Sequence, residues 1–383
     1  MTIPADSVGL VTPQRVTIDT PLLLSCGETL NSYDLVYETY GELNPEKDNA
    51  VLICHALSGH HHAAGYHSNA EGEKPGWWES CIGPGKAIDT NKFFVVVPNN
   101  IGGCHGTSGP NTINPKTGKV WGPDFPKLRF RDWVNSQAQL ADLLGIDAWA
   151  AIVGGSLGGM QAMRWSLEYP DRVRHCLLIA TAMNLTPQNI AFNELARRAI
   201  VADPNFADGW FLEKDVSPVR GLALARMIGH VTYLSQNQME ERFGRELREG
   251  SFERGINSPI QFEIESYLNY KGDRFAEEFD ANTYILITRM LDVFDLAREY
   301  DHDPVKAFSR ARAKFLVVSF STDWRFSPER SYEIVNALVG ANRDVSYVNI
   351  DTHLGHDGFL SPIPRYVDAL SSYLGNISCG GGQ

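Results

Sequence analysis

The sequence has no long hydrophobic run and no closely paired cysteines, and each absence excludes a class of protein. No segment approaches the roughly 20 apolar residues that a membrane-spanning helix needs. The N-terminus lacks a basic start followed by an apolar block, so no signal peptide is expected. The six cysteines are widely spread without a CxxC pair, and we interpret them as reduced thiols. Together these features predict a cytoplasmic protein that does not bind a membrane.

Positive charge is also scarce. The 383 residues contain 34 Lys and Arg against 46 Asp and Glu, which gives a formal net charge of −12. Because binding to a phosphate backbone relies on clustered Lys and Arg, nucleic acid is not expected as a partner. Hydrophobic residues make up 43% of the chain, enough to bury the core of one large α/β domain that carries an inserted subdomain.

Short apolar runs alternate with segments of helical periodicity. Residues 50–55 and 314–320 are continuous apolar runs, typical of strands covered on both faces, whereas residues 35–40 alternate and predict a half-buried strand. A strand at 149–154, a helix at 160–168 and a strand at 173–180 form a βαβ unit. The sequence therefore predicts an α/β fold with a mostly parallel central sheet.

The pattern changes between about residues 184 and 303. Buried-strand runs disappear there, charge rises and helix-forming residues dominate. We interpret residues 185–304 as an inserted helical lid that separates two parts of the core, residues 1–184 and residues 305–383.

One glycine-rich segment joins a predicted strand to a predicted helix. It reads Gly154-Gly-Ser-Leu-Gly-Gly, which is the G-x-S-x-G pattern in its required strand–turn–helix context. Small residues permit a tight turn that lifts the Ser156 hydroxyl above the sheet edge, and the Leu157 amide points to where an oxyanion would form. The alternative is a glycine-rich turn with an incidental serine. The flanking strand and helix favour a nucleophile at Ser156.

A serine nucleophile needs a base, and the base needs a group that orients it. Asp323 and His356 each follow a predicted strand in the second part of the core, where ligands bind in open α/β sheets. Asp351 is a rival for the orienting carboxylate and His353 is a rival for the base. We favour Asp323 and His356, because His356 lies in the tighter glycine-flanked loop.

A group of histidines suggests a metal site as another possibility: His55, His60, His61, His62 and His67. Metal sites usually add carboxylate or cysteine ligands at a defined spacing, and this segment contains no such pattern. We therefore expect no metal and no cofactor.

With these residues in place, the chain resembles the homoserine O-acyltransferases of the α/β-hydrolase fold, the MetX family. The matching segments span nearly the whole chain: His55-Ala-Leu-Ser-Gly-His, Gly102-Gly-Cys-His-Gly-Thr-Ser-Gly-Pro, Gly154-Gly-Ser-Leu-Gly-Gly-Met-Gln-Ala, residues 184–193 and Gly355-His-Asp-Gly-Phe. The second and third are unusually specific when found together.

The resemblance implies a ping-pong transfer of an acyl group from acyl-CoA to the hydroxyl of L-homoserine, in methionine biosynthesis. In the family, an amide that falls here on Leu57 completes the oxyanion hole. Arg226 matches the residue that binds the homoserine carboxylate, and Asp357 matches the one that binds its amino group. Tyr233 is expected to line the same tunnel. The family also implies a homodimer.

The family includes acetyl and succinyl transferases, and the segment at Trp324 and Arg325 bears on the choice. A succinyl group ends in a carboxylate, which a guanidinium binds in bidentate fashion, whereas an acetyl group offers Arg325 nothing. We therefore predict succinyl-CoA as the donor substrate. The alternatives are a homoserine O-acetyltransferase, a serine esterase with the same triad, and a non-catalytic binding protein on the same scaffold.

Overall fold

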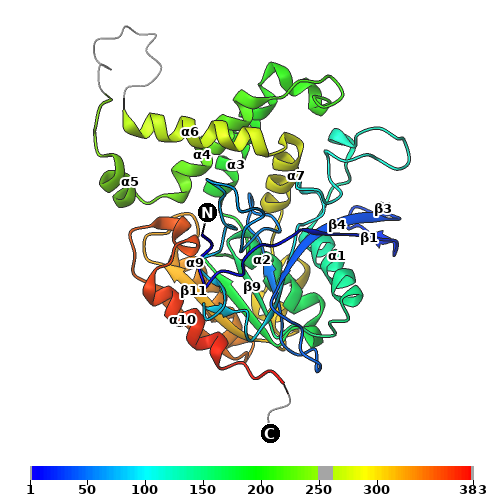
Figure 1. Ribbon diagram of the computed structural model, residues 1–383, viewed down its shortest axis with the longest axis vertical. Coiled ribbons are helices and arrows are strands. Elements are labelled where there is room, and N and C mark those ends of the chain that lie inside the picture. Colours follow the sequence, from blue (N-terminus) through cyan, green and yellow to red (C-terminus); the bar gives the residue numbers. More distant parts are fainter. Residues whose placement is uncertain (1, 249–261, 381–383) are drawn as a thin grey trace.

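The computed structural model of the protein describes residues 2–248 and 262–380. An eight-stranded sheet forms its centre (Figure 1). Its strands are β1 (Gln14–Ile18), β4 (Tyr33–Tyr40), β5 (Ala50–Cys54), β8 (Phe94–Pro98), β9 (Ala151–Gly155), β10 (His175–Ile179), β11 (Lys314–Phe320) and β12 (Val345–Ile350). Two-stranded pairs lie outside it: β2 (Leu22–Leu23) with β3 (Thr29–Leu30), and β6 (Ile82–Gly83) with β7 (Ile88–Asp89).

The strand order is β1-β4-β8-β5-β9-β10-β11-β12. β1 and β4 pair antiparallel, β4 pairs antiparallel with β8, and all pairs from β8 to β12 are parallel. The predicted mostly parallel sheet is confirmed. Because neighbouring strands run the same way, β5, β9, β11 and β12 deliver the residues that follow them to one edge of the sheet.

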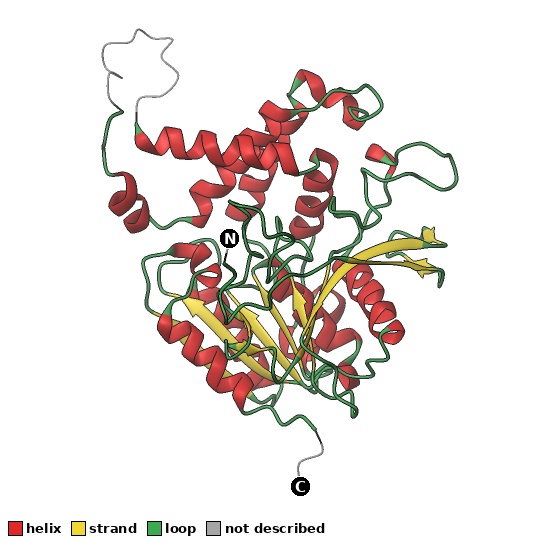
Figure 2. Ribbon diagram, viewed as in Figure 1, coloured by secondary structure: helices red, strands yellow, loops and turns green. Residues whose placement is uncertain are grey.

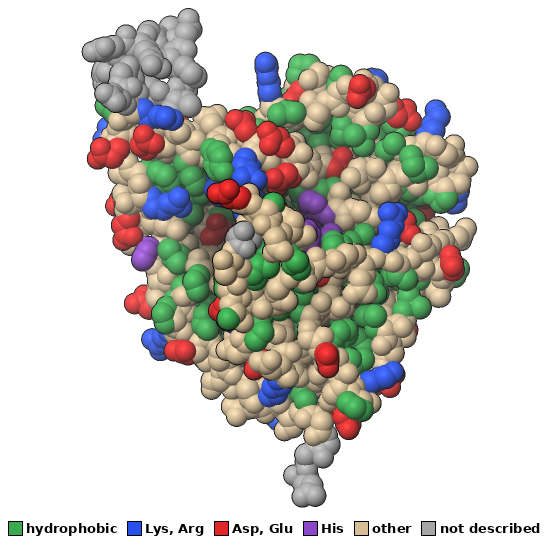
Figure 3. Space-filling view, in the orientation of Figure 1, with side chains coloured by type: hydrophobic (Ala, Val, Ile, Leu, Met, Phe, Trp, Pro, Cys, Tyr) green, Lys and Arg blue, Asp and Glu red, His purple; other side chains and the backbone are tan. Residues whose placement is uncertain are grey.

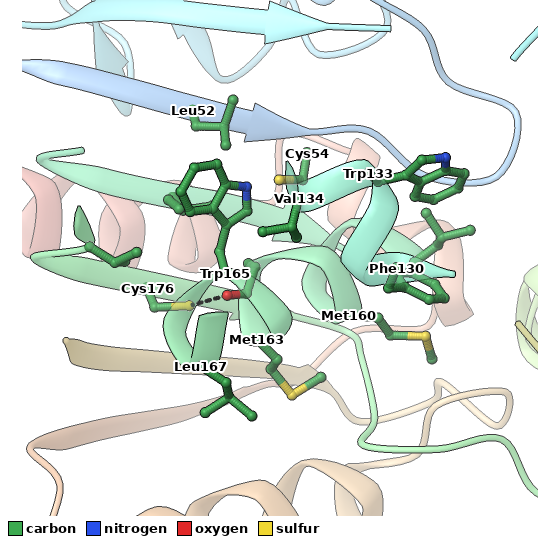
Figure 4. Packing of buried hydrophobic residues seen from close by; sticks show 14 of the residues in the cluster. Leu52, Cys54, Phe130, Trp133, Val134, Met160, Met163, Trp165, Leu167 and Cys176 are labelled. Atoms are coloured by element: carbon green, nitrogen blue, oxygen red, sulfur yellow. Dashed lines mark hydrogen bonds between the residues drawn. The ribbon is translucent and has the colours of Figure 1, made fainter. Parts of the chain in front are cut away.

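Helices cover the two faces of the sheet. One face packs against α1 (Phe130–Leu143), α2 (Leu157–Glu168) and α9 (Pro328–Gly340), with the short α8 (Pro304–Phe308) beside α9. Figure 4 shows this interior, where Trp165 of α2 lies near Leu52 of β5, and Trp133 of α1 belongs to the same buried cluster. The other face packs against α10 (Pro364–Gly375) and the segment between β5 and β8.

Two local predictions differ from the structure. α2 begins at Leu157, directly after the serine, rather than at Met160. The low helix propensity of the two glycines hid this first turn, which packing stabilises. β4 was predicted as half-buried, yet no residue in it is exposed, and Glu38 has 0% exposure. The reason is that β4 lies inside the sheet, where the histidine-bearing loop after β5 covers it.

The helices that follow β10 form a layer of their own above the sheet (Figures 1 and 2). They are α3 (Pro187–Val201), α4 (Val219–Tyr233), α5 (Gln236–Phe243), α6 (Glu263–Glu278) and α7 (Ala281–Asp292), with a short 3-10 helix, η3 (Pro204–Gly209). Apolar side chains from α3, α4, α6 and α7 form a separate core in this layer. We call these helices the lid.

The lid helices α4 and α6 approach unusually closely at one point. A Cβ atom added to Gly272 of α6 would lie 2.9 Å from the Ala223 carbonyl oxygen of α4, so a side chain there would push the helices apart. The predicted boundaries of the lid and the two core parts stay predictions, and residues 1, 249–261 and 381–383 within them lie outside the described residues. In the described part of the chain, no helix is long and apolar enough to cross a membrane.

Several histidines of the core are held in surroundings that disfavour their charged form. His55 and His61, in the loop after β5, are 3% and 7% exposed, and burial lowers the pKa of each to about 4. Burial also lowers the pKa of His175, at the start of β10, to about 4. These side chains are therefore neutral in the folded protein near pH 7.

We expect these histidines to make their full contribution to the free energy of unfolding above the unfolded-state histidine pKa of about 6.5. That contribution should fall as the pH drops from there toward about 4. In that window the unfolded chain takes up protons that the folded chain cannot. The slope approaches about 1.4 kcal/mol per pH unit for each group that titrates only in the unfolded state. Urea unfolding at a series of pH values measures it.

The variant His175→Gln should flatten this slope, because it removes one of the contributing histidines. His302→Gln is the matched control, since the His302 side chain is 71% exposed. Equal slopes in the His175→Gln variant and the parent protein would contradict the prediction.

Candidate active site

Ser156 occupies a strained turn between β9 and α2. Its backbone φ is +56° and its ψ is −123°, a region that L-residues rarely adopt. The turn requires glycine on either side, because a Cβ atom on Gly154 would lie 2.1 Å from the Gly158 carbonyl oxygen. A Cβ atom on Gly158 would lie 2.0 Å from the Cys54 carbonyl oxygen. The predicted tight turn is therefore present, and it raises Ser156 at the sheet edge.

Three side chains from three different strand ends form a hydrogen-bonded chain. His356, in the 3-10 helix η5 (Gly355–Leu360) after β12, places Nε2 2.9 Å from Ser156 Oγ. Its Nδ1 lies 2.7 Å from Oδ2 of Asp323, which follows β11. The amides of Arg325 and Phe326 both donate to the other Asp323 oxygen, each at 2.9 Å. This carboxylate therefore stays fixed and ready to accept from the imidazole.

The two rival residues take other partners. Asp351 accepts a hydrogen bond from the Ser321 hydroxyl at the surface. His353 is about half exposed, and its Nε2 lies 3.3 Å from a Glu241 carboxylate oxygen. Neither one contacts Ser156.

A cavity of about 220 Å³ opens above Ser156 and His356. It brings together most of the residues that the sequence singled out: Leu57, Leu157, Arg226, Tyr233, Arg325 and Asp357 all line it. Leu57 comes from the loop after β5 and Leu157 is the first residue of α2, so two separate segments bring them to the cavity that Ser156 also lines. Neither amide donates a hydrogen bond within the described residues, which leaves both free for an oxyanion.

Two arginines face this cavity from opposite parts of the fold. Arg226 comes from α4 and donates to the Ser58 hydroxyl at 3.0 Å, and Arg325 follows β11 and donates to the Thr232 hydroxyl at 2.7 Å. Their guanidinium carbons lie 5.8 and 5.5 Å from the centre of the Tyr233 ring. In the part of the chain that the structure describes, neither arginine has a carboxylate within 4.0 Å. Both cations are thus available to an anionic ligand.

Asp357 supplies the negative charge of the cavity. Burial raises the pKa of its carboxyl, while His356, Arg226 and Lys271 act in the opposite direction. A cation that binds beside Asp357 would stabilise the ionised form of its carboxyl. The cation would in turn gain a carboxylate partner that is shielded from bulk water.

One predicted site residue lies elsewhere. Trp324 does not line the cavity; its Nε1 donates to the Leu234 carbonyl at 3.1 Å, and its ring lies 5.8 Å from Phe192 of the lid. A second link joins the same region, because a Cβ atom on Gly355 would lie 2.6 Å from the Ser235 amide nitrogen. The Ser235 hydroxyl also donates to the His353 carbonyl. The end of α4 is therefore attached to both loops that carry the base and its orienting carboxylate.

The sequence reasoning missed two ionisable lid residues that also line the cavity, His230 and Lys271. His230 lies one turn past Arg226 on α4, so the helical spacing of Arg226, His230 and Tyr233 could have revealed it. Burial lowers the pKa of His230 to about 3. Lys271 comes from α6, a helix far away in sequence, and nothing in the sequence pattern predicts its position.

The sequence reasoning also missed a carboxylate beside the histidines. Glu38 of β4 lies 3.0 Å from His62 Nδ1 and 2.7 Å from His67 Nε2, and it accepts from the Tyr40 hydroxyl at 2.7 Å. The ligand atoms of Glu38, His62 and His67 lie within 4.8 Å of one another and could hold a metal ion. The assumption that no carboxylate accompanies the histidines is thus wrong. These side chains already give the buried carboxylate hydrogen-bond partners without an ion, and the absence of a metal stays a prediction.

Comparisons with known proteins agree with this arrangement. Residues 49–361 match the model of the α/β-hydrolase fold family. Over 375 residues the chain is 66% identical to a homoserine O-succinyltransferase from Cellvibrio japonicus, and the match covers 98% of each protein.

Solved structures extend the likeness. A homoserine O-acetyltransferase from Bacillus anthracis matches with a TM-score of 0.89 and 28% identity, over 96% of this chain and 99% of that one. The esterase E22 matches with a TM-score of 0.85 and 29% identity, over 95% of this chain and 100% of that one. The chain therefore belongs to the α/β-hydrolase fold family and, within it, to the homoserine O-acyltransferases that its motifs resemble.

Proposed function

We propose that this protein transfers the succinyl group of succinyl-CoA to the hydroxyl of L-homoserine through a covalent succinyl-Ser156 intermediate. The observation that carries the proposal is that the guanidinium groups of Arg226 and Arg325 both line the cavity above Ser156 without a carboxylate partner among the described residues. A succinyl group and homoserine each bring one carboxylate, so two separate cations match the two reactants. Relatives named homoserine O-succinyltransferase, such as the one from Cellvibrio japonicus, support the same reaction.

The first half of the reaction forms the acyl-enzyme. His356 Nε2 takes the proton of Ser156 as Oγ attacks the thioester carbonyl carbon. The amides of Leu57 and Leu157 stabilise the resulting oxyanion. When the carbon–sulfur bond breaks, the imidazolium returns its proton to the departing thiolate, so CoA leaves as the thiol. Asp323 holds the imidazole in the required tautomer throughout.

The second half repeats these steps with homoserine as the nucleophile. Arg226 binds its carboxylate and Asp357 binds its ammonium group, which brings the hydroxyl to the acyl carbon. His356 takes the hydroxyl proton and then gives it to Ser156 as the serine ester bond breaks. Tyr233 lies near both arginines and His356. We therefore propose that its ring keeps the donor carboxylate apart from the acceptor carboxylate.

The same triad would support a serine esterase if water replaced homoserine. The lid favours transfer, because the helices that cover the cavity limit the access of water to the acyl-enzyme. The two functions are separated by the fate of the acyl group, which an esterase releases without homoserine.

We expect intact-mass spectrometry to detect one succinyl group on the protein after it is mixed with succinyl-CoA, and homoserine to remove that group. The variants Ser156→Ala and His356→Gln should lose this mass gain and reduce kcat by about 10⁴-fold or more, because each removes an essential part of the nucleophile. His353→Gln is the matched control, since that neighbouring histidine pairs with Glu241 instead. A succinyl adduct on the Ser156→Ala variant would overturn the proposed intermediate.

We expect Arg325→Leu to lower kcat/KM for succinyl-CoA by about 10- to 100-fold, which is the magnitude of one charge-assisted hydrogen bond. Acetyl-CoA should show no such loss, because its acyl group has no carboxylate. Steady-state rates with both donors give the ratio. Arg325→Lys keeps the charge and should retain part of the preference.

Arg325 is 8% exposed, so the folding of each variant is checked by thermal unfolding. An equal fall in kcat/KM for both donors, in a folded variant, would contradict the assignment of Arg325 to the succinyl carboxylate.

A further inference from the structure

The active-site cavity contains more positive charge than the proposed reaction has used. Three cations line it: Arg226, Lys271 and Arg325. The carboxylate of Asp357 lines it too, and this residue is not part of the hydrogen-bonded pair of Asp323 and His356. Two reactant carboxylates and one ammonium group would occupy Arg226, Arg325 and Asp357. Lys271 is the cation that remains.

Lys271 reaches the cavity because α4 and α6 pack so closely. The contact between Gly272 and Ala223 lies next to Lys271 on one helix and one turn before Arg226 on the other. The two cations therefore face the same part of the cavity. The Arg226 guanidinium also lies 4.7 Å from the Phe275 ring of α6, which holds it on the side of that helix.

No carboxylate lies within 4.0 Å of the Lys271 ammonium group in the described ranges, residues 2–248 and 262–380. Its neighbour is aromatic, since Nζ lies 5.8 Å from the Tyr267 ring centre. Burial and the nearby Arg226 lower the pKa of Lys271, whereas Asp357 raises it. Two like charges that face one cavity repel each other, and an anion between them would relieve that repulsion.

The surface as a whole does not create this positive site. The chain has a net charge of −12, and on the face drawn in Figure 3 basic and acidic side chains are interspersed over the lid. The attraction for an anion is therefore local to the cavity, where the partial burial of these side chains strengthens it.

We propose that Lys271 is a second cation of the acceptor subsite, so that the homoserine carboxylate is held between Arg226 and Lys271. The assignment favours homoserine over the succinyl group because the contact between Gly272 and Ala223 brings Lys271 to the side of Arg226, the proposed partner of the homoserine carboxylate. It rests on the proposed function, since it takes homoserine as the acceptor. Lys271 then selects acceptors that carry a carboxylate.

A ping-pong reaction allows the two halves to be measured separately. Lys271→Met keeps the length of the side chain and removes its charge. We expect kcat/KM for L-homoserine to fall by about 10- to 100-fold, while the rate at which succinyl-CoA forms the acyl-enzyme stays unchanged. With L-homoserine methyl ester, which keeps the hydroxyl and the ammonium group but lacks the carboxylate, the parent and the variant should react at the same rate.

Two further variants control for charge and for structure. Lys271→Arg keeps the charge and should restore most of the homoserine rate. Arg274→Met removes a cation from the same helix, but one that already pairs with Glu278 at 3.1 Å, and should leave both halves unchanged.

The outcomes distinguish this inference from the proposed function. A fall in acyl-enzyme formation by Lys271→Met, or an equal loss with homoserine and its methyl ester, would overturn the role of Lys271. Failure of the parent protein to form any acyl-enzyme would instead overturn the proposed function.

Discussion

The active site depends on how closely two pieces of backbone pass each other beneath Ser156. The carbonyl of residue 158 lies where a side chain of residue 154 would be, and residue 158 in turn has no space beside Cys54. Only a glycine at each position lets the helix begin directly after the strand. The strained serine, the position of its hydroxyl at the cavity and the free Leu157 amide are all consequences of that steric constraint, and the rest of the site is arranged around them.

Much of this arrangement could be predicted from the sequence because it depends on local patterns. The apolar run at residues 314–320 identified β11 with its observed bounds, and the ends of predicted strands indicated Ser156, Asp323 and His356. In a parallel sheet, residues after neighbouring strands meet at one edge, so order along the chain was enough. The predicted cytoplasmic location and homodimer concern properties outside the fold of one chain and stay predictions.

Other features could not be predicted, because they depend on contacts between distant segments. Residues 35–40 alternate as a half-buried strand does, and the complete burial of Glu38 follows from a histidine-rich loop that folds over β4. Lys271 joins the cavity only because two lid helices meet at Gly272. Trp324, adjacent to the predicted Arg325, instead turns to the lid and bonds the Leu234 carbonyl. Neighbours in sequence can serve different parts of a structure.

That last bond, with the contacts of Gly355 and Ser235, fixes one end of α4 to the core. Arg226 lies two turns further back along the same helix. The other half of α4 is packed against α6 at Ala223, so any opening motion would move these two helices together about residues 233–235. The hydrogen bond between Ser156 and His356 lies next to this pivot. Movement of the lid about this point would leave the geometry for proton transfer unchanged from one turnover to the next.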